Sequence, residues 1–500
     1  MTDVLTPPSA KPPAGSAAEV TEHQLVPAAP GAAELKAVLD RQRAAFQAAG
    51  PPSLRQRRKD LRKLEDLVLR NRVPLAEALR EDFGHRSRTE TEIAEIVGSA
   101  HSLRYARRHV GIWMLPRLRG TSIWFLPGSN RVVAQPKGVI GIVAPWNYPV
   151  HLTMAPLAAA LAAGNRAMIK MSEFTPSTTA LLTRLLGEAF SIDQVYVTGG
   201  DADVAREFCS LPLDHLLFTG STQNGRAVMH AAAENLTPVT LELGGKSPVV
   251  VDEKYSIEEA ARRIVWGKLF NAGQTCVAPD YVLVPAGSED RFVRAATAAA
   301  RSLYPTLTSN EDATAIINSG HYERLRSLVD DARAQGAAVT VAEHGDAENP
   351  ASRKLPLHVV TGVSDSMRLA REEIFGPVLP VVGYRKLDEA IGYINDRPRP
   401  LAMYLFTHSG RRKRALLKRT TSGGVTVNDT LLHYLQDGLP FGGSGESGMG
   451  SYHGREGFET FSHHKAVFTQ RGAFGFTGTK LLHPPYGRIA SLLLRLMRRI

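Results

Sequence analysis

Cysteine is scarce in this 500-residue chain, which contains only Cys209 and Cys276. Two cysteines cannot build a disulfide framework, so we expect a reducing compartment and a fold held by its core. Cys209 lies in a predicted helical segment, where a free cysteine usually packs as a small apolar side chain. Cys276 lies in the turn-rich segment 271–279, where packing and nucleophilic chemistry both remain open.

Long apolar runs are also missing. No segment is long enough to cross a bilayer as a helix. Residues 1–31 lack the basic and apolar regions of a signal peptide and are rich in Pro, Ala and Ser, which predicts a disordered tail. Together with the low cysteine content, these absences predict a cytoplasmic protein.

Acidic residues are absent from the C-terminal part of the chain. Residues 461–500 hold seven Lys or Arg and no Asp or Glu, within a net charge of +11. Residues 475–500 are expected to form a basic amphipathic tail, because five apolar residues between Ile489 and Ile500 share one helical face. Such a helix could make peripheral contact with an anionic membrane or pack on protein, and both remain open. Nucleic-acid binding is not expected, because the basic stretches, including residues 55–59, are not interleaved with aromatic residues.

The remaining sequence alternates apolar β-branched runs with helical segments. Residues 33–110 are predicted to be helical, and the runs 123–126 and 131–134 predict a β-hairpin around Pro127–Asn130. Residues 138–144 begin a series of buried strands separated by helices, and a second series begins after Thr240. This pattern predicts an α/β fold with two doubly wound, Rossmann-like domains and an inserted hairpin.

Four segments carry residues that local structure alone does not require. These are Ala144-Pro-Trp-Asn-Tyr-Pro149 after a predicted strand, Phe218-Thr-Gly-Ser-Thr-Gln-Asn-Gly225 before a predicted helix, Leu241-Glu-Leu-Gly-Gly-Lys-Ser-Pro248, and the segment around Cys276. Asn147 offers an amide donor for an oxyanion. The glycines of 218–225 would let the backbone approach a pyrophosphate. Glu242 lies in an apolar setting that suits a general base.

Each of these segments also has a simpler interpretation. Asn147 could be a turn asparagine, 218–225 an ordinary turn without a ligand, and Glu242 a partner of Lys246 in an ion pair. One predicted strand and one predicted helix separate Glu242 from Cys276, a spacing that could bring the two residues to face each other across a cleft. A nucleophile, a base, an amide donor and a phosphate-binding turn together favour chemistry at Cys276.

The sequence resembles the NAD(P)-dependent aldehyde dehydrogenase superfamily over about residues 35–470. Within it, residues 82–87, 439–443 and 447–454 are similar to the class 3 branch, and most of all to coniferyl aldehyde dehydrogenases. The motifs that carry the superfamily resemblance are Pro145-Trp-Asn-Tyr-Pro149, Phe218-Thr-Gly-Ser-Thr222, Leu241-Glu-Leu-Gly-Gly-Lys-Ser-Pro248, Gly273-Gln-Thr-Cys276 and Glu372-Glu-Ile-Phe-Gly-Pro377.

The resemblance implies catalytic roles. Cys276 would be the nucleophile, Glu242 the general base, and Asn147 with the backbone N–H of Cys276 the oxyanion hole. The aldehyde would form a thiohemiacetal and then a thioester that water hydrolyses to the acid. Tyr148 and Phe441 would line the substrate tunnel, and no metal is implied.

The resemblance also implies a cofactor site. Lys170 and Glu173 would hold the adenosine ribose, and a carboxylate there favours NAD, although NADP stays open. The other implied cofactor residues are Trp146, Gly220, Ser221, Gly225, Glu373 and Phe375. The implied domains are a cofactor domain (32–120 and 136–245), a catalytic domain (246–440) and an oligomerisation arm (121–135 and 460–474), which suggests a homodimer.

The substrate is not determined by these residues. An apolar or aromatic aldehyde similar to coniferyl aldehyde is expected, with long- or medium-chain fatty aldehydes as the alternative. A CoA-acylating enzyme is disfavoured by the presence of Glu242. A cysteine hydrolase using His453 or His463 is disfavoured by the cofactor motifs.

Overall fold

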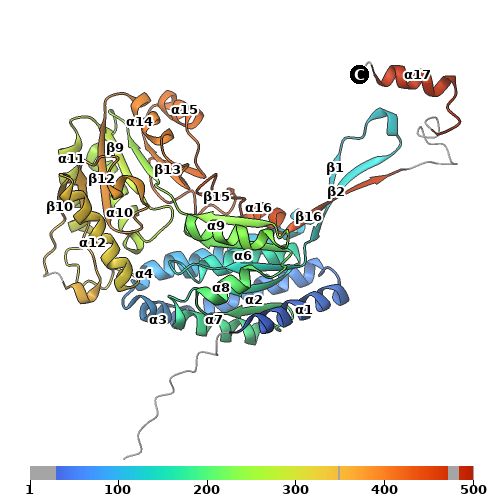
Figure 1. Ribbon diagram of the computed structural model, residues 1–500, viewed down its shortest axis with the longest axis horizontal. Helices are drawn as coiled ribbons and strands as arrows, with labels where there is room; N and C mark the ends of the chain where they lie inside the picture. The colour runs from blue at the N-terminus through green and yellow to red at the C-terminus, as the bar shows by residue number, and fades with distance from the viewer. Residues whose placement is uncertain (1–29, 347–348, 471–482, 499–500) are drawn as a thin grey trace, which may run out of the picture.

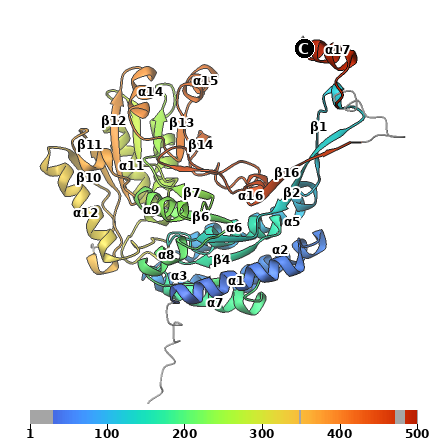
Figure 2. The ribbon, with the colours of Figure 1, turned by 45° about the vertical axis from the view of Figure 1, so that its right-hand side comes forward.

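The chain forms two α/β units and a projecting arm in the computed structural model, which describes residues 30–346, 349–470 and 483–498 (Figure 1). The predicted disordered tail lies almost wholly outside the described residues. Figure 2 shows the two units side by side, with the arm leaving the body on one side. This arrangement confirms the predicted fold class.

The N-terminal helices form a layer on the first unit. The apolar residues of the second helix, such as Leu61, Leu64 and Val68, are fully buried, which explains their helical spacing. The helices of this layer are α1 (Ala32–Ala49), α2 (Leu54–Arg70), α3 (Arg72–Phe83), α4 (Arg88–Thr91), the π-helix η1 (Glu92–Val97) and α5 (Gly98–Trp113).

The first unit is built on a six-stranded sheet with the order β15-β7-β6-β3-β4-β5. All neighbours are parallel except β15, which runs antiparallel to β7. Its strands are β3 (Val139–Val143), β4 (Arg166–Lys170), β5 (Val195–Thr198), β6 (His215–Gly220), β7 (Val239–Leu243) and β15 (Gly448–Met449). Its crossover helices are α6 (His151–Ala163), α7 (Pro176–Ala189), α8 (Ala202–Cys209) and α9 (Thr222–Ala233).

The second unit is built on a seven-stranded sheet with the order β10-β11-β12-β9-β8-β13-β14, in which only β10 is antiparallel to its neighbour. Its strands are β8 (Pro248–Val251), β9 (Tyr281–Pro285), β10 (Ala338–Val341), β11 (His358–Thr361), β12 (Val378–Tyr384), β13 (Ala402–Phe406) and β14 (Gly424–Val427). Its helices are α10 (Ile257–Leu269), η3 (Phe270–Gly273), α11 (Glu289–Leu303), α12 (Ser319–Ala334), η4 (Pro350–Ser352), α13 (Arg368–Arg371), α14 (Leu387–Asn395) and α15 (Gly410–Arg419).

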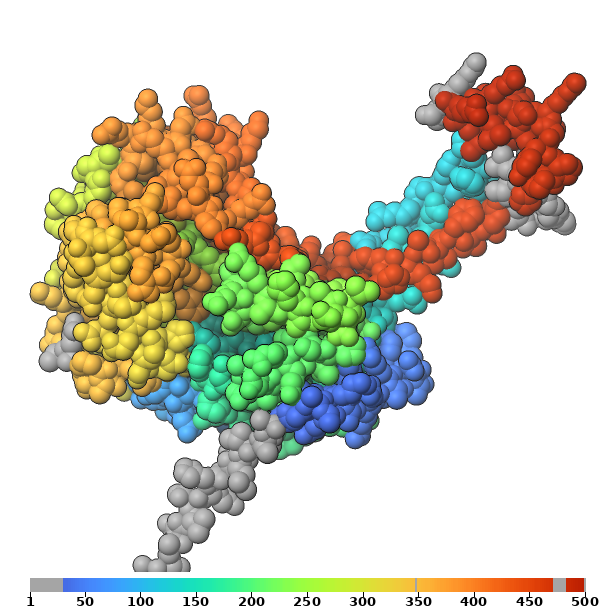
Figure 3. Space-filling view, viewed as in Figure 1, coloured from blue at the N-terminus to red at the C-terminus, as the bar shows by residue number. Residues whose placement is uncertain are grey.

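The arm is a three-stranded antiparallel sheet of β1 (Arg117–Arg119), β2 (Ser129–Pro136) and β16 (Ser462–Thr469). The prediction of a first hairpin strand at 123–126 was wrong. Ile123–Phe125 is a short 3-10 helix, η2, and β1 pairs with β2 instead. Pro127 follows one residue after η2, and the Gly128 N–H donates to Phe125 O, so this segment turns the chain rather than extending it. Figure 3 shows how far the arm projects.

The chain returns to the first unit through α16 (Gly454–Thr460) and ends in α17 (Arg488–Met497) beyond the hairpin tip (Figure 1). Ala490 of α17 is buried, whereas Ile489, Leu492 and Leu496 are exposed. Within the described ranges, no helix combines the length and the apolar character needed to cross a membrane.

Candidate active site

The order of strands in the first sheet creates a crevice. From β3 the chain moves to β4 and β5 on one side and then returns to β6 and β7 on the other, so the order reverses between β3 and β6. Ligands bind outside the carboxyl ends of parallel strands at such a reversal. The loop that follows β3 carries Trp146, Asn147 and Tyr148, and Gly220 ends β6.

The segment around Cys276 is held in an unusual backbone conformation. After α10 ends at Leu269, the residues Asn271, Ala272 and Gly273 have φ values of 53°, 53° and 75°. A Cβ atom at position 273 would lie 2.6 Å from a backbone oxygen, so only glycine fits there. Gln274 fixes this turn, since its amide donates to Asn271 O and Ala315 O, both at 3.0 Å.

Asn147 lies directly on this loop. Its Nδ2 donates to Gln274 O at 3.1 Å, and its own carbonyl oxygen accepts from Asn271 Nδ2 at 3.2 Å. The side chain is almost fully buried. The structure therefore brings the predicted amide donor to the loop that ends in Cys276.

Glu242 is a buried carboxyl group without a partner. It lies on β7 between Thr219 of β6 and Gly448 of β15, and is 3% exposed. Neither of its oxygens has a hydrogen-bond partner among the described residues. Burial raises the pKa of Glu242 well above its usual value. The alternative of an ion pair with Lys246 is wrong, because Lys246 pairs with Asp280.

The Cys276 thiol is electrostatically coupled to two carboxyl groups. Burial and, to a smaller extent, the nearby charges of Glu373 and Glu242 raise its pKa to about 12, although backbone N–H groups of Cys276 and Val277 act in the opposite direction. The thiol is therefore protonated at neutral pH and needs a base within reach. Cys209 packs in the core, as predicted.

The predicted ribose residues follow β4. Lys170 Nζ donates to Gly200 O at 2.6 Å and lies 3.9 Å from Glu173 Oε2. Lys170 is almost fully buried, and burial lowers its pKa, whereas the Glu173 side chain is 43% exposed. A buried ammonium that presents a half-exposed carboxylate is a suitable arrangement for sugar hydroxyls.

The predicted pyrophosphate residues form the start of α9. The Ser221 side chain caps this helix by accepting from Asn224 N at 3.2 Å. A Cβ atom at position 225 would lie 2.6 Å from Leu243 Cδ2, so glycine allows the helix to approach β7 closely. The positive end of the α9 dipole faces the crevice, which favours an anion there.

Glu373 and Phe375 approach from the second unit. The Glu373 carboxyl lies over the turn that follows β7, because a Cβ atom at Gly244 would be 2.0 Å from its Oε2. Burial raises the pKa of Glu373 to about 7. Phe375 has a φ of 53°, and its ring meets Trp146 edge-on at 5.3 Å. The structure therefore brings Phe375 against Trp146 and Glu373 against the turn after β7.

Several residues that support this site were not predicted as part of it. Lys246 donates to Leu369 O and Glu372 O, and its partner Asp280 accepts from Ile374 N at 2.9 Å, so the pair anchors the Glu373 loop. The His321 ring lies 5.0 Å from the Trp146 ring in a tilted contact. The sequence shows Lys246 and Asp280 as single residues, but no local pattern in it indicates that they are in contact.

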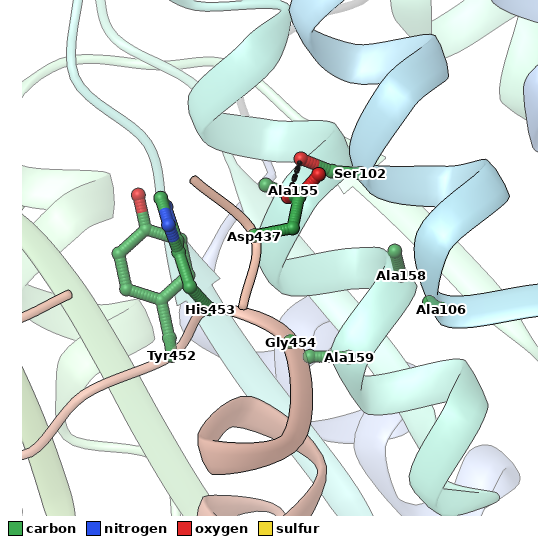
Figure 4. Close-up of a pocket in the computed structure, with 9 residues that line it drawn as sticks. All are labelled: Ser102, Ala106, Ala155, Ala158, Ala159, Asp437, Tyr452, His453 and Gly454. Carbon is green, nitrogen blue, oxygen red and sulfur yellow. Dashed lines mark hydrogen bonds between the residues drawn. The ribbon is translucent and has the colours of Figure 1, made fainter. Parts of the chain in front are cut away.

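Of the two predicted substrate residues, Tyr148 contacts the Cys276 loop and Phe441 belongs to an aromatic cluster. The Tyr148 hydroxyl lies 2.6 Å from Thr275 Oγ1, next to Cys276 in the chain. Phe441 stacks on His453 at 5.0 Å and meets Tyr434 at 4.7 Å. Figure 4 shows a small cavity beside this cluster, where the rings of Tyr452 and His453 lie next to the Ser102–Asp437 hydrogen bond.

Comparison with known proteins identifies the family. The sequence profile of the aldehyde dehydrogenase family matches residues 18–467. The chain belongs to the aldehyde dehydrogenase family. It is 50% identical to a probable coniferyl aldehyde dehydrogenase of Pseudomonas aeruginosa, over 91% of this chain and 94% of that protein. It is 41% identical to aldehyde dehydrogenase family 3 member A2 of Rattus norvegicus, over 71% of this chain and 72% of that protein.

Solved structures agree with this family assignment. Substrate-bound AldH of Staphylococcus aureus has a TM-score of 0.87 at 35% identity, covering 93% of this chain and 99% of that one. A betaine aldehyde dehydrogenase variant of the same organism, in complex with NAD+, has a TM-score of 0.80 at 26% identity. This match covers 89% of this chain and 91% of that one. This aldehyde dehydrogenase is an oxidoreductase that depends on NAD(P).

The geometry of this aldehyde dehydrogenase disfavours a cysteine–histidine hydrolase. His463 is exposed on β16 in the arm, away from the crevice. His453 is buried, but neither ring nitrogen has a hydrogen-bond partner in the described part of the chain. Burial lowers its pKa to about 3, so it stays neutral.

Proposed function

We propose that the protein oxidises an apolar or aromatic aldehyde, similar to coniferyl aldehyde, to the carboxylic acid, with Cys276 as nucleophile, Glu242 as general base and Asn147 as oxyanion donor. The observation that carries this proposal is the unpartnered, buried Glu242 carboxyl, coupled electrostatically to a thiol on the loop that Asn147 contacts. A buried base without a structural partner is available for proton transfer.

The steps at the protein follow from these groups. Glu242 takes the thiol proton, and the Cys276 sulfur bonds to the aldehyde carbon. Asn147 Nδ2 and the Cys276 backbone N–H donate to the resulting oxyanion. When bound, the dinucleotide supplies the hydride acceptor for the oxidation. After Glu242 has released the first proton to solvent, it removes a proton from water, which attacks the thioester carbon. The Cys276 sulfur leaves as the thiolate and the carboxylic acid is released.

The crevice residues fit a nicotinamide dinucleotide. Glycine at position 244 lets the Glu373 carboxyl lie against the turn after β7, where any Cβ would clash with it, and α9 begins at the reversal of strand order. We propose that Lys170 and Glu173 hold the adenosine ribose, that Gly220, Ser221 and Gly225 lie by the pyrophosphate, and that Trp146, Glu373 and Phe375 border the nicotinamide end.

NAD is the preferred cofactor in this proposal, because the Glu173 carboxylate would repel a 2′-phosphate. The kcat/KM ratio for NAD+ over NADP+ tests this preference. Glu173→Gln should shift the ratio toward NADP+, and an unchanged ratio would remove Glu173 from this role.

A hydroxylated aromatic aldehyde suits the substrate end of the site. Tyr148 and Phe441 offer aromatic walls, and neither His453 nitrogen has a hydrogen-bond partner among the described residues. A neutral imidazole can both donate to and accept from a phenol. The name of the Pseudomonas relative agrees with this substrate class.

A substrate panel separates this class from fatty aldehydes. We expect a higher kcat/KM for coniferyl aldehyde than for cinnamaldehyde, octanal or hexadecanal. His453→Phe should raise the KM for coniferyl aldehyde and leave that for cinnamaldehyde nearly unchanged. A preference for hexadecanal would favour the fatty aldehyde alternative, and NADH formation that requires CoA would favour the CoA-acylating one.

We assign the cofactor domain to residues 32–120 and 136–245 except β1, the catalytic domain to 246–440, and an oligomerisation arm to 121–135 and 460–474 together with β1. Of the arm, residues 471–474 lie outside the described residues. The arm supports a homodimer, because it projects from the body and exposes apolar side chains such as Leu118 and Phe468. Light scattering of the purified full chain tests this assignment, and a monomer at micromolar concentration would contradict it.

A cytoplasmic location with peripheral membrane contact is also part of this proposal. The exposed Ile489, Leu492 and Leu496 of α17 are flanked by Arg488 and Arg495, a pattern suited to an anionic bilayer surface. Co-sedimentation with anionic and neutral liposomes, comparing the full chain with a form ending at Lys480, tests it. Equal recovery of both forms would favour packing of α17 on protein instead.

A further inference from the structure

Glu90 links the N-terminal helical layer to the loop that carries Cys276. Its Oε2 accepts from Asn271 N at 3.0 Å and from Thr314 Oγ1 at 2.8 Å, and its Oε1 accepts from Tyr304 OH at 3.4 Å. All three donors belong to the second unit, whereas Glu90 belongs to α4 on the first. The carboxyl group is buried, so these bonds are made away from water.

The backbone at Asn271 needs such an acceptor. Asn271 and Ala272 both have a φ of 53°, a conformation that is costly for residues other than glycine. Asn271 is fully buried, and its N–H would be an unpaired buried donor without Glu90. The hydrogen bond therefore stabilises a strained turn at the point where α10 gives way to the nucleophile loop.

The side chain of Asn271 extends this effect to the reacting groups. Its Nδ2 donates to Asn147 O and to Gln274 O, both at 3.2 Å. Asn147 Nδ2 donates to the same Gln274 oxygen. A shift at Asn271 would therefore move the proposed oxyanion donor and the loop of Cys276 together.

We propose that Glu90 is a positioning residue for the nucleophile loop, holding the Asn271–Gly273 turn so that Cys276 and Asn147 face one reacting carbon. This inference rests on the proposed role of Cys276. It assigns a function in the reaction to a residue of the helical layer that touches neither substrate nor cofactor.

The surroundings show that Glu90 is built into place. Ser87 caps α4 by accepting from Glu90 N at 3.2 Å, which fixes the backbone. Arg86 is fully buried, lies 3.1 Å from Glu95 and supplies a nearby positive charge. Burial nevertheless raises the pKa of Glu90 to about 7, so the carboxyl group is kept at a cost to stability. Such a cost is common at functional positions.

Three variants and a control test the proposal. Glu90→Ala removes the acceptor, Glu90→Leu removes it without leaving a cavity, and Glu90→Gln retains an acceptor oxygen. Glu92→Gln, two residues along the chain on η1, is the matched control. The readouts are kcat and KM with coniferyl aldehyde, and the rate at which iodoacetamide alkylates Cys276 in the cofactor-free enzyme, followed by peptide mapping.

We expect Glu90→Ala and Glu90→Leu to lower kcat and the alkylation rate roughly ten-fold with little change in KM, and Glu90→Gln to stay within about three-fold of wild type. Adding Ala272→Gly to either removal variant should restore part of both rates, because glycine adopts the turn without strain.

Wild-type kcat and alkylation rates in a folded Glu90→Ala or Glu90→Leu enzyme would overturn the proposal, and so would a change confined to KM. Should Glu90→Ala not fold, Glu90→Leu decides by the same criteria. The Cys276→Ala variant tests the proposed function separately. Full activity in that variant would overturn the role of Cys276, whereas loss of its activity together with wild-type rates in the Glu90 variants would overturn only the role of Glu90.

Discussion

Lys246 and Asp280 form a buried ion pair, and this pairing leaves Glu242 without a cation, although Lys246 is only four residues away in the chain. The lysine points to the second unit and anchors the Glu373 loop instead. Glu242 therefore keeps a raised pKa, and its two oxygens have no hydrogen-bond partner within the described ranges; these are the properties of a base rather than of a structural carboxylate.

Glu242→Gln should lower steady-state turnover by about 10²–10⁴-fold, the usual contribution of a general base. NADH should still form in a slow burst of up to one equivalent per active site, because hydrolysis of the thioester depends most on the base. Stopped-flow absorbance measures both phases. Unchanged turnover would remove Glu242 from this role.

The pH dependence should follow from the same carboxyl group. Its pKa is raised, so the base form accumulates only at higher pH than for an ordinary glutamate. We expect kcat/KM for the aldehyde to rise with pH above the range in which an ordinary glutamate ionises, and this rise should be smaller in Glu242→Gln. A flat wild-type profile between pH 6 and 9 would contradict the assignment.

Asp280→Asn should destabilise the protein by about 3 kcal/mol, because it leaves the buried Lys246 ammonium unpaired. The KM for NAD+ should also rise, since the Glu373 loop loses its anchor. Thermal unfolding and NAD+ titration measure the two effects. Asp365→Asn is the control and should cost less than about 1 kcal/mol, because the Asp365 carboxylate that pairs with Arg397 is exposed to solvent.

Gly448→Ala should reduce activity at least ten-fold, because the added Cβ would lie 2.1 Å from Leu241 O and push β15 away from β7 beside Glu242. Gly187→Ala, in α7 with open space around it, is the matched control and should keep activity. Equal activities in both variants would show that β15 does not support the base.

The stability of the protein should reflect the ionisation of Glu90. Its folded pKa of about 7 exceeds the ordinary 4.5, so the folded state binds more protons between these values. The contribution of this pKa difference to the free energy of unfolding is complete below about pH 4.5 and is lost as pH rises through 7. The loss amounts to roughly 3 kcal/mol at pH 8. The Tm of Glu90→Gln minus the Tm of wild type should therefore be larger at pH 8 than at pH 5, because only the wild-type side chain loses a proton between these pH values. The same difference at both pH values would contradict a raised pKa.

Much of the fold was predictable because it depends on local patterns. The apolar runs at β3 and β13 and the leucine spacing in α2 report burial directly. The first strand of the hairpin was not predictable from its β-rich composition, because the pairing of β1 with β2 places Ile123–Phe125 in the connecting turn. The short strand β15 has no local signal, since its formation depends on β7.

The reacting groups were predictable from their motifs, but their supports were not. Glu90 and Asn271 lie 181 residues apart, and nothing in the segment around Glu90 indicates its partner. The same holds for Asp280 and Ile374, which are joined only when the Glu373 loop folds over the crevice. Contacts between distant segments depend on the tertiary fold and leave no periodic signal in the sequence.

Covalent chemistry at Cys276 is the central claim, and intact-mass spectrometry with peptide mapping tests it most directly. Glu242→Gln enzyme mixed with NAD+ and coniferyl aldehyde should gain the mass of one acyl group, located on the peptide that contains Cys276. The adduct should be absent without NAD+ and absent in the Cys276→Ala/Glu242→Gln double variant. An acyl group on another residue, or turnover by Cys276→Ala at the wild-type rate, would contradict the account.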